Sequence, residues 1–223
     1  MRTYGYLLKP QFWLYQIRLV WSWSNLIPIG ILGIILINEL TSFSPSRVRA
    51  ISDLIWIFEI YLPLVGLFFI TNIIPSECDD RTLELHLTYP QSSFEFLFTR
   101  VMAIVIFLMI ILFITLLAVY QWYATFELGE VLFRVLPTIA YFTAIGLFFS
   151  SITGSYTGAI IPPVLYWAWE LTTQGRITRS FSLFAWTYPQ PGIDLIVNKV
   201  ILALLASLLI SLSARVFSRK RLL

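Results

Sequence analysis

The sequence has few charged residues. Of its 223 residues, 12% are charged and 58% are hydrophobic, whereas a typical soluble domain has about 25% charged and roughly 45–50% apolar residues. The mean hydropathy is +0.82. Because so few charges cannot cover the surface of a soluble globule of this size, the composition excludes an ordinary cytosolic enzyme and a disordered chain. It predicts an integral membrane protein.

Residues that carry catalytic or metal chemistry are also scarce. Cys78 is the single cysteine and His86 the single histidine, which excludes an intrachain disulfide and any metal or haem site that needs two histidines. The sequence has no Gly-x-x-x-x-Gly-Lys-Ser/Thr loop, no Gly-x-Ser-x-Gly motif and no Gly-x-Gly-x-x-Gly motif. We therefore expect no enzyme activity, no metal and no cofactor in this chain.

Long apolar runs dominate what is present. A membrane-spanning helix needs about 20 mostly apolar residues, and six runs meet this length approximately: 21–40, 53–74, 101–123, 131–152, 155–172 and 195–216. These runs are continuously apolar and do not alternate as the strands of a membrane barrel do. The sequence predicts an all-α integral membrane protein with six transmembrane helices in one domain, residues 1–223.

The positive charges predict the orientation. If the N-terminus lies in the cytoplasm, nine Lys and Arg residues flank the runs inside and six outside, and inside loops carry the excess of such residues. The basic residues are dispersed except at the C-terminus, in Arg219, Lys220 and Arg221. We therefore predict a multi-pass protein of the cell membrane with both termini cytoplasmic, and no nucleic-acid partner.

Two segments beside the runs have an amphipathic or aromatic character. Residues 9–25 place Arg18 and other polar residues at helical spacing among aromatic residues such as Trp13 and Trp21, which predicts a helix lying in the membrane interface or a looser anchor. Residues 173–194 contain a short apolar stretch, 181–186. They predict a re-entrant segment or interfacial helix on the outer face, or a loop that inserts its aromatic residues among lipid headgroups.

A few polar residues and prolines fall within the apolar runs. Glu59 is the deepest acid, and burial of a charge in a membrane requires a partner or water. It could serve gating or translocation, or it could form an interhelical hydrogen bond. Glu170 and Lys199 lie near run ends, where we expect their side chains to extend toward water. Pro162 and Pro163 could unwind the fifth run, which makes them further translocation candidates.

The segment 75–99 is the most polar part of the chain and joins the second run to the third. It contains five of the twelve acidic residues. The alternation of leucines with polar residues would suit a strand, but a lone strand leaves its backbone unpaired. We favour a helix that ends before Pro90, followed by a second helix that Ser92 or Ser93 could cap and that continues into the third run.

This segment resembles the signature of type-two ATP-binding-cassette (ABC) exporter permeases. In that family an acidic residue is followed, between spans two and three, by Gly-Thr-Leu-Glu-x-Leu-Leu-x-x-Pro-x-Ser-Arg. The matching residues are Glu77, Thr82, Leu83, Glu84, Leu87, Pro90 and Ser93. Arg81 stands at the usual glycine position and Phe94 replaces the basic residue after the serine. Six spans, an interfacial N-terminal helix and an apolar outer segment also fit the family's layout.

The resemblance implies that segment 75–99 is a coupling helix that docks on a separate ATPase subunit, which binds ATP and Mg. It also implies a dimer of permease subunits, identical or paralogous, surrounded by membrane lipid. The residues expected at the ATPase contact are Glu77, Asp80, Arg81, Thr82, Leu83, Glu84, Leu87, Tyr89 and Pro90. Independently of the family, the carboxylates can bind Arg or Lys of a partner, and the leucines offer an apolar anchor.

Several functions remain open from the residues alone. The leading hypothesis is the permease subunit of an ABC exporter. Because the runs are rich in Phe, Trp, Tyr and Leu and almost free of charge, we expect an amphiphilic or hydrophobic substrate such as a peptide, antibiotic or lipid. The alternative is an ATP-independent secondary transporter or channel that uses Glu59. A membrane enzyme and a non-transporting membrane partner are further alternatives, and segment 75–99 could instead pack against the chain's own bundle.

Overall fold

A computed structural model describes residues 23–42, 47–79, 93–122, 128–189 and 191–220. These residues form six α-helices and one 3₁₀ turn and contain no strand. The elements are α3 (Trp23–Ser42), α4 (Arg47–Asp79), α6 (Ser93–Trp122), α7 (Leu128–Thr153), α8 (Tyr156–Thr173), η1 (Arg179–Phe181) and α9 (Leu195–Lys220). Each of the six apolar runs of the sequence lies almost entirely within one helix, which confirms the all-helical fold.

Three of these helices contain a stretch long and apolar enough to cross a membrane: Leu97–Leu117, Gly129–Thr153 and Leu195–Ser218. Shorter apolar stretches occur in α3 and α4, at Ile27–Asn38 and Ile55–Thr71. A spanning helix needs about 20 residues, so the structure supports a membrane protein with several apolar helices. Six crossings remain a prediction of the sequence.

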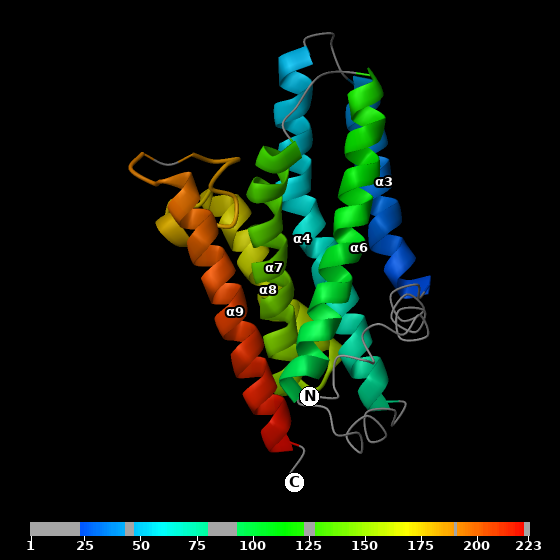
Figure 1. The fold of residues 1–223 in the computed structure, drawn as a ribbon, viewed down its shortest axis with the longest axis vertical. Coiled ribbons are helices and arrows are strands. Elements are labelled where there is room, and N and C mark those ends of the chain that lie inside the picture. Colours follow the sequence, from blue (N-terminus) through cyan, green and yellow to red (C-terminus); the bar gives the residue numbers. More distant parts are fainter. Residues whose placement is uncertain (1–22, 43–46, 80–92, 123–127, 190, 221–223) are drawn as a thin grey trace, which may run out of the picture.

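Consecutive helices alternate in direction (Figure 1). In Figure 1 the α8–α9 connection, residues 174–194, lies at the upper ends of α8 and α9, in the same half of the bundle as the end of α3 and the start of α4, which extend further up. The end of α4, the start of α6 and the end of α9 lie at the opposite, lower end. The up-and-down order follows from short links between long helices, which leave antiparallel neighbours as the simplest arrangement.

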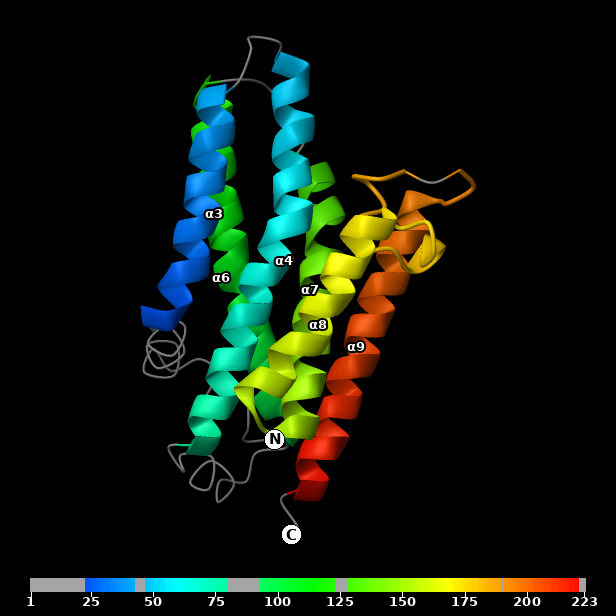
Figure 2. The same ribbon diagram turned by 180° about the vertical axis from the view of Figure 1, so that it is seen from behind.

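Helices α4 and α7 form the centre of the bundle. Figures 1 and 2 show α3 and α6 on one side of them and α8 and α9 on the other, and α7 packs against α9, α4 and α8. Gly66 and Gly146 allow α4 and α7 to approach closely: a Cβ at Gly66 would lie 2.7 Å from Thr143 Oγ1, and one at Gly146 would overlap Leu67. The core therefore depends on small residues where these two helices cross.

The outer surface of the bundle is apolar. On α3, large exposed side chains recur at helical spacing, at Ile27, Ile31, Ile34 and Ile37, and α6 and α9 carry similar exposed rows. Soluble proteins rarely expose such continuous apolar surfaces. The surface is suited to lipid or to another membrane subunit, in agreement with the composition.

Helix α8 differs from one expectation. It is continuous from Tyr156 to Thr173 and contains Pro162 and Pro163, so these prolines do not unwind it. Its start is capped by Ser155, whose Oγ accepts a hydrogen bond from the Gly158 N–H at 3.2 Å. Neighbouring helices can support a helix that contains proline, and α8 packs against α7 and α4.

Candidate functional site

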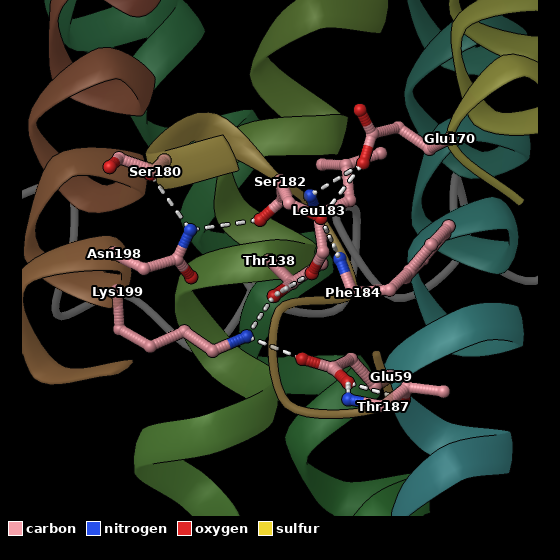
Figure 3. Close-up of polar contacts among 10 residues, drawn as sticks. All are labelled: Glu59, Thr138, Glu170, Ser180, Ser182, Leu183, Phe184, Thr187, Asn198 and Lys199. Atoms are coloured by element: carbon pink, nitrogen blue, oxygen red, sulfur yellow. Dashed lines mark hydrogen bonds and ion pairs between the residues drawn. The ribbon is translucent and has the colours of Figure 1, made fainter. Parts of the chain in front are cut away.

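A cluster of buried polar side chains lies where α4, α7, α8 and α9 meet the α8–α9 connection (Figure 3). Most of its members are fully inaccessible to solvent, although the surrounding core is apolar. Buried polar groups require hydrogen-bond partners, and here they find them mainly in one another. The side chains are those of Glu59, Thr138, Glu170, Ser182, Thr187, Asn198 and Lys199, and the backbones of Ser180, Leu183 and Phe184 complete the contacts.

The centre of the cluster is an ion pair between Glu59 of α4 and Lys199 of α9. Lys199 Nζ lies 2.6 Å from Glu59 Oε1, and the two side chains are 1% and 0% exposed. Two charges out of water are stable only when they are paired and further hydrogen-bonded. The sequence allowed two roles for Glu59, and the structure shows the interhelical contact. A role of Glu59 in gating or translocation stays a prediction.

Two threonines complete the hydrogen bonding of this pair. Thr138 of α7 accepts a hydrogen bond from Lys199 Nζ at 2.9 Å and donates one to the Leu183 carbonyl at 3.3 Å. Thr187 donates from its backbone N–H at 2.9 Å and from its hydroxyl at 2.6 Å, both to Glu59 Oε2. We call Glu59, Lys199, Thr138, Leu183 and Thr187 the polar ring, because these contacts join α4, α7, α9 and the α8–α9 connection.

A second buried carboxylate, Glu170 of α8, binds the same connection through neutral donors. Its Oε2 accepts hydrogen bonds from Ser182 Oγ at 2.9 Å and from the Leu183 N–H at 3.2 Å. Its Oε1 has no hydrogen-bond partner within the described part of the chain. Nearby, Asn198 Nδ2 of α9 donates to the carbonyls of Ser180 and Ser182 at 2.9 and 3.0 Å. The connection is thus held by side chains of four helices.

These contacts explain the conformation of the α8–α9 connection. Gln174 and Gly175 end α8 with positive φ angles of 52° and 71°, and η1 is a single 3₁₀ turn. Residues Leu183 to Ala185 are buried, and Arg134 of α7 lies over the Trp186 ring, 3.3 Å from its centroid. The interfacial helix that the sequence offered as one alternative is not formed, because side chains bond the backbone groups that a helix would pair internally.

The positions of Glu170 and Lys199 correct a second expectation. Both were expected to extend toward water near the membrane interface, but both are buried and engaged by other elements. Extension to water is unnecessary because each finds partners inside the bundle. Lys199 and Glu59 are 140 residues apart, so no local pattern reveals the pair. The one feature of the sequence that could have indicated the pair is that Glu59 and Lys199 lie at similar depths below the same predicted membrane face.

The residues predicted to contact an ATPase lie at the lower end of the bundle or beyond the described residues. Glu77 falls in the last turn of α4. The others, Asp80, Arg81, Thr82, Leu83, Glu84, Leu87, Tyr89 and Pro90, lie outside the described residues, as do the interfacial residues Trp13, Arg18 and Trp21. Helix α6 is described from Ser93 onward, and the predicted capping of this helix by Ser92 or Ser93 stays a prediction because Ser92 lies outside the described residues.

The described residues offer no obvious reaction centre. Within the described ranges, no group of three or more His, Cys, Asp and Glu side chains could hold a metal ion. The buried carboxylates bind neighbouring helices and the α8–α9 connection, so the arrangement serves to fix helices relative to one another. The cluster is thus suited to holding or changing a conformation.

The comparison of the sequence with known protein families agrees with a helical membrane protein. The sequence model of the ABC-2 family transporter protein matches residues 16–166, which include α3 to α7, most of α8 and the polar segment between α4 and α6. No curated protein matches the chain. Because the match covers more than half of the 223 residues, this chain belongs to the ABC-2 family of transporter proteins and is a membrane permease of that type.

Proposed function

We propose that this chain is the transmembrane subunit of an ABC exporter and couples ATP hydrolysis in a separate ATPase subunit to export of an amphiphilic or hydrophobic substrate. The observation that carries the proposal is the family match across the α4–α6 region, which includes the predicted coupling segment. The lower end of the bundle is then cytoplasmic, and the α8–α9 connection faces outward.

The helices on either side of the coupling segment support a mechanical role. Helix α4 has 33 residues and α6 has 30, which correspond to about 50 and 45 Å at 1.5 Å per residue. Both pack against α7, the central helix. A segment fixed to two long, packed helices transmits a displacement better than a flexible loop does.

The partner contacts follow from the residues of that segment. Glu77, Asp80 and Glu84 present carboxylates to basic residues of the ATPase, and Leu83 and Leu87 present an apolar anchor. In this proposal ATP and Mg bind to the ATPase subunit, and a second permease subunit, identical or paralogous, completes the pathway.

The proposed substrate class follows from the surfaces of the helices. Large apolar residues such as Phe98, Phe113 and Trp169 are exposed on α6 and α8, whereas the charged residues of the polar ring are buried and paired. A pathway lined by such helices favours a peptide, antibiotic or lipid over a small hydrophilic solute. Transport assays with a panel of amphiphiles test this, and a sugar as the sole substrate would contradict it.

The experiment that tests the proposal is purification of the chain from its own cells with whatever chains bind it, followed by reconstitution in liposomes. We expect an ATPase subunit to copurify and to hydrolyse ATP. Glu84→Lys should release the ATPase, whereas Glu130→Gln, which removes an exposed charge of α7 near the opposite end but keeps an acceptor oxygen for Arg134, should leave the complex intact. Solute flux by the isolated chain without any ATPase, abolished by Glu59→Gln, would instead establish the secondary transporter or channel.

A further inference from the structure

The polar ring connects the α8–α9 connection to three helices at one point. Starting from Glu59, the contacts run to Lys199, then to Thr138 and the Leu183 carbonyl. The chain from Leu183 to Thr187 and the hydrogen bond from Thr187 to Glu59 close the ring. Figure 3 shows these groups facing one another across α4, α7 and α9. A movement of α4 at Glu59 therefore changes the contacts that hold both Leu183 and Thr187.

Helix α4 extends from this ring to the other end of the bundle. It is one continuous helix to Asp79, 20 residues beyond Glu59, or about 30 Å at 1.5 Å per residue. The segment expected to contact the ATPase follows directly. The same helix thus carries the ring 12 residues after its start at Arg47 and the proposed motor contact at its other end.

The backbone of α4 is weakened beside Glu59. Pro63 lies four residues later within the helix and has no N–H, so the Glu59 carbonyl lacks its usual helical hydrogen bond. The next turn is held from α8, because Trp167 Nε1 donates to the Ile60 carbonyl at 2.9 Å. Pro63 therefore makes α4 easier to bend at the point where the Glu59 side chain enters the ring, as Pro75 does near the lower end of the same helix.

The ring also secures an apolar plug. Leu183, Phe184 and Ala185 are at most 1% exposed and lie between the two backbone positions, Leu183 and Thr187, that the ring binds. Because an unpaired buried charge is costly, Glu59 and Lys199 are stable either paired in the closed ring or separated and hydrated. Opening the ring therefore admits water and removes the contacts of Thr138 and Glu59 with the connection, so that only the neutral hydrogen bonds of Glu170 and Asn198 still hold the plug.

We propose that Glu59, Lys199 and Thr187 are positioning residues that transmit the ATP-driven movement of α4 to the α8–α9 connection. When the ATPase displaces the lower end of α4, the ring opens and residues 183–185 leave the upper end of the bundle. This inference rests on the proposed function, because it requires the ATPase to act on α4.

The test measures exposure of the plug in the complete complex with its ATPase. Cys78→Ser removes the only native thiol, and Ala185→Cys introduces one at a buried position. A water-soluble maleimide then reports exposure without nucleotide and with Mg, ATP and vanadate. In this parent complex we expect slow labelling without nucleotide and faster labelling in the trapped state.

Variants of the ring residues distinguish a role in transmitting the movement of α4 from a role in the stability of the fold alone. Glu59→Gln with Lys199→Met removes both charges, so we expect ATP hydrolysis to persist while the nucleotide-dependent rise in labelling is lost. If the double variant does not fold, Thr187→Val, which keeps both charges, takes its place and should reduce the nucleotide-dependent rise in labelling. Lys199→Arg should retain the rise because it keeps the cation. Glu170→Gln should also retain it because that carboxylate lies outside the ring.

The outcomes distinguish this inference from the proposed function. An unchanged rise in labelling in the ring variants overturns the inference. So does a parent complex that hydrolyses ATP without any rise, although the proposed function then stands. A chain that neither binds an ATPase nor supports ATP hydrolysis overturns both.

Discussion

Two carboxylates hold the α8–α9 connection, and they do so by different means. Glu59 accepts hydrogen bonds from a lysine and from two groups of Thr187. Glu170 accepts hydrogen bonds from a serine hydroxyl and a backbone N–H. Both side chains are fully buried, so burial alone does not distinguish them.

The difference lies in what remains when each carboxylate is lost. Without Glu59, the buried Lys199 ammonium keeps, among the described residues, only Thr138 as a hydrogen-bond partner and no ion-pair partner. Without Glu170, only neutral donors lose a partner, and neutral groups are far cheaper to leave in the interior than charges. The contact of Glu59 with the connection therefore depends on its charge, whereas that of Glu170 depends only on hydrogen bonding. Substitutions that remove the charge but keep an acceptor oxygen distinguish the two.

The largest expected effect is that of Glu59→Gln. Breaking a buried ion pair on one side costs about 3–5 kcal/mol, so the free energy of unfolding, measured by SDS titration in mixed micelles, should fall by that amount. The matched Glu170→Gln keeps an acceptor oxygen for its neutral donors and should cost about 1 kcal/mol. Adding Lys199→Met to Glu59→Gln should recover part of the loss. Equal costs for the two Glu→Gln variants would contradict the distinction.

Thr187→Val should have the next largest effect. It removes the hydroxyl that donates to Glu59 Oε2 at 2.6 Å, and a hydrogen bond to a charged group contributes about 1.5–3 kcal/mol. Thr187→Ser keeps the hydroxyl and is the control, with a smaller loss. The same titration measures both variants, and similar losses for Val and Ser would show that the methyl group, not the hydroxyl, matters.

Ser182→Ala examines the neutral anchor. Its hydroxyl donates to Glu170 Oε2 and accepts from the Phe184 N–H, and leaving such buried groups unpaired costs about 1–3 kcal/mol. The control is Ser207→Ala on α9, where an exposed hydroxyl bonds the Ala203 carbonyl and the expected change is within about 0.5 kcal/mol. If Ser182→Ala and Ser207→Ala unfold at the same midpoint in the SDS titration, Ser182 does not anchor the connection.

Arg134→Met should have the smallest effect. The guanidinium lies over the Trp186 ring and forms an ion pair with the exposed Glu130, and these two contacts together contribute about 1–2 kcal/mol. Methionine keeps an apolar stem without the charge, and Arg134→Lys keeps a cation as the control. Tryptophan fluorescence during unfolding measures both variants, and a loss as large as that of Glu59→Gln would mean that Arg134 belongs to the ion-pair system.

Much of the fold was predictable because hydrophobic length is a local property. The run 155–172 corresponds to α8 (Tyr156–Thr173), and 195–216 lies within α9. The second run was extended at both ends: α4 runs from Arg47 to Asp79, because a helix continues beyond the apolar core wherever its polar residues can be solvated.

The polar cluster was less predictable. The sequence singled out Glu59 as an acid that needs a partner, but the partner, Lys199, was assigned to the interface. Asn198, Ser182 and Thr187 carry no local signal, because polar residues near a run end are ordinary. Their role arises only when α4, α7, α8 and α9 bring them together.

The composition and the length of the apolar runs by themselves determined that this chain is a helical membrane protein, because burial of backbone polar groups in lipid leaves few other structures. The pattern of residues 77–93 also indicated its family. Only the tertiary structure decided that Glu59 and Lys199 share one buried site and that the α8–α9 connection is held there. The physical reason is that an ion pair between residues 140 positions apart depends on how the helices pack, which no local sequence pattern specifies.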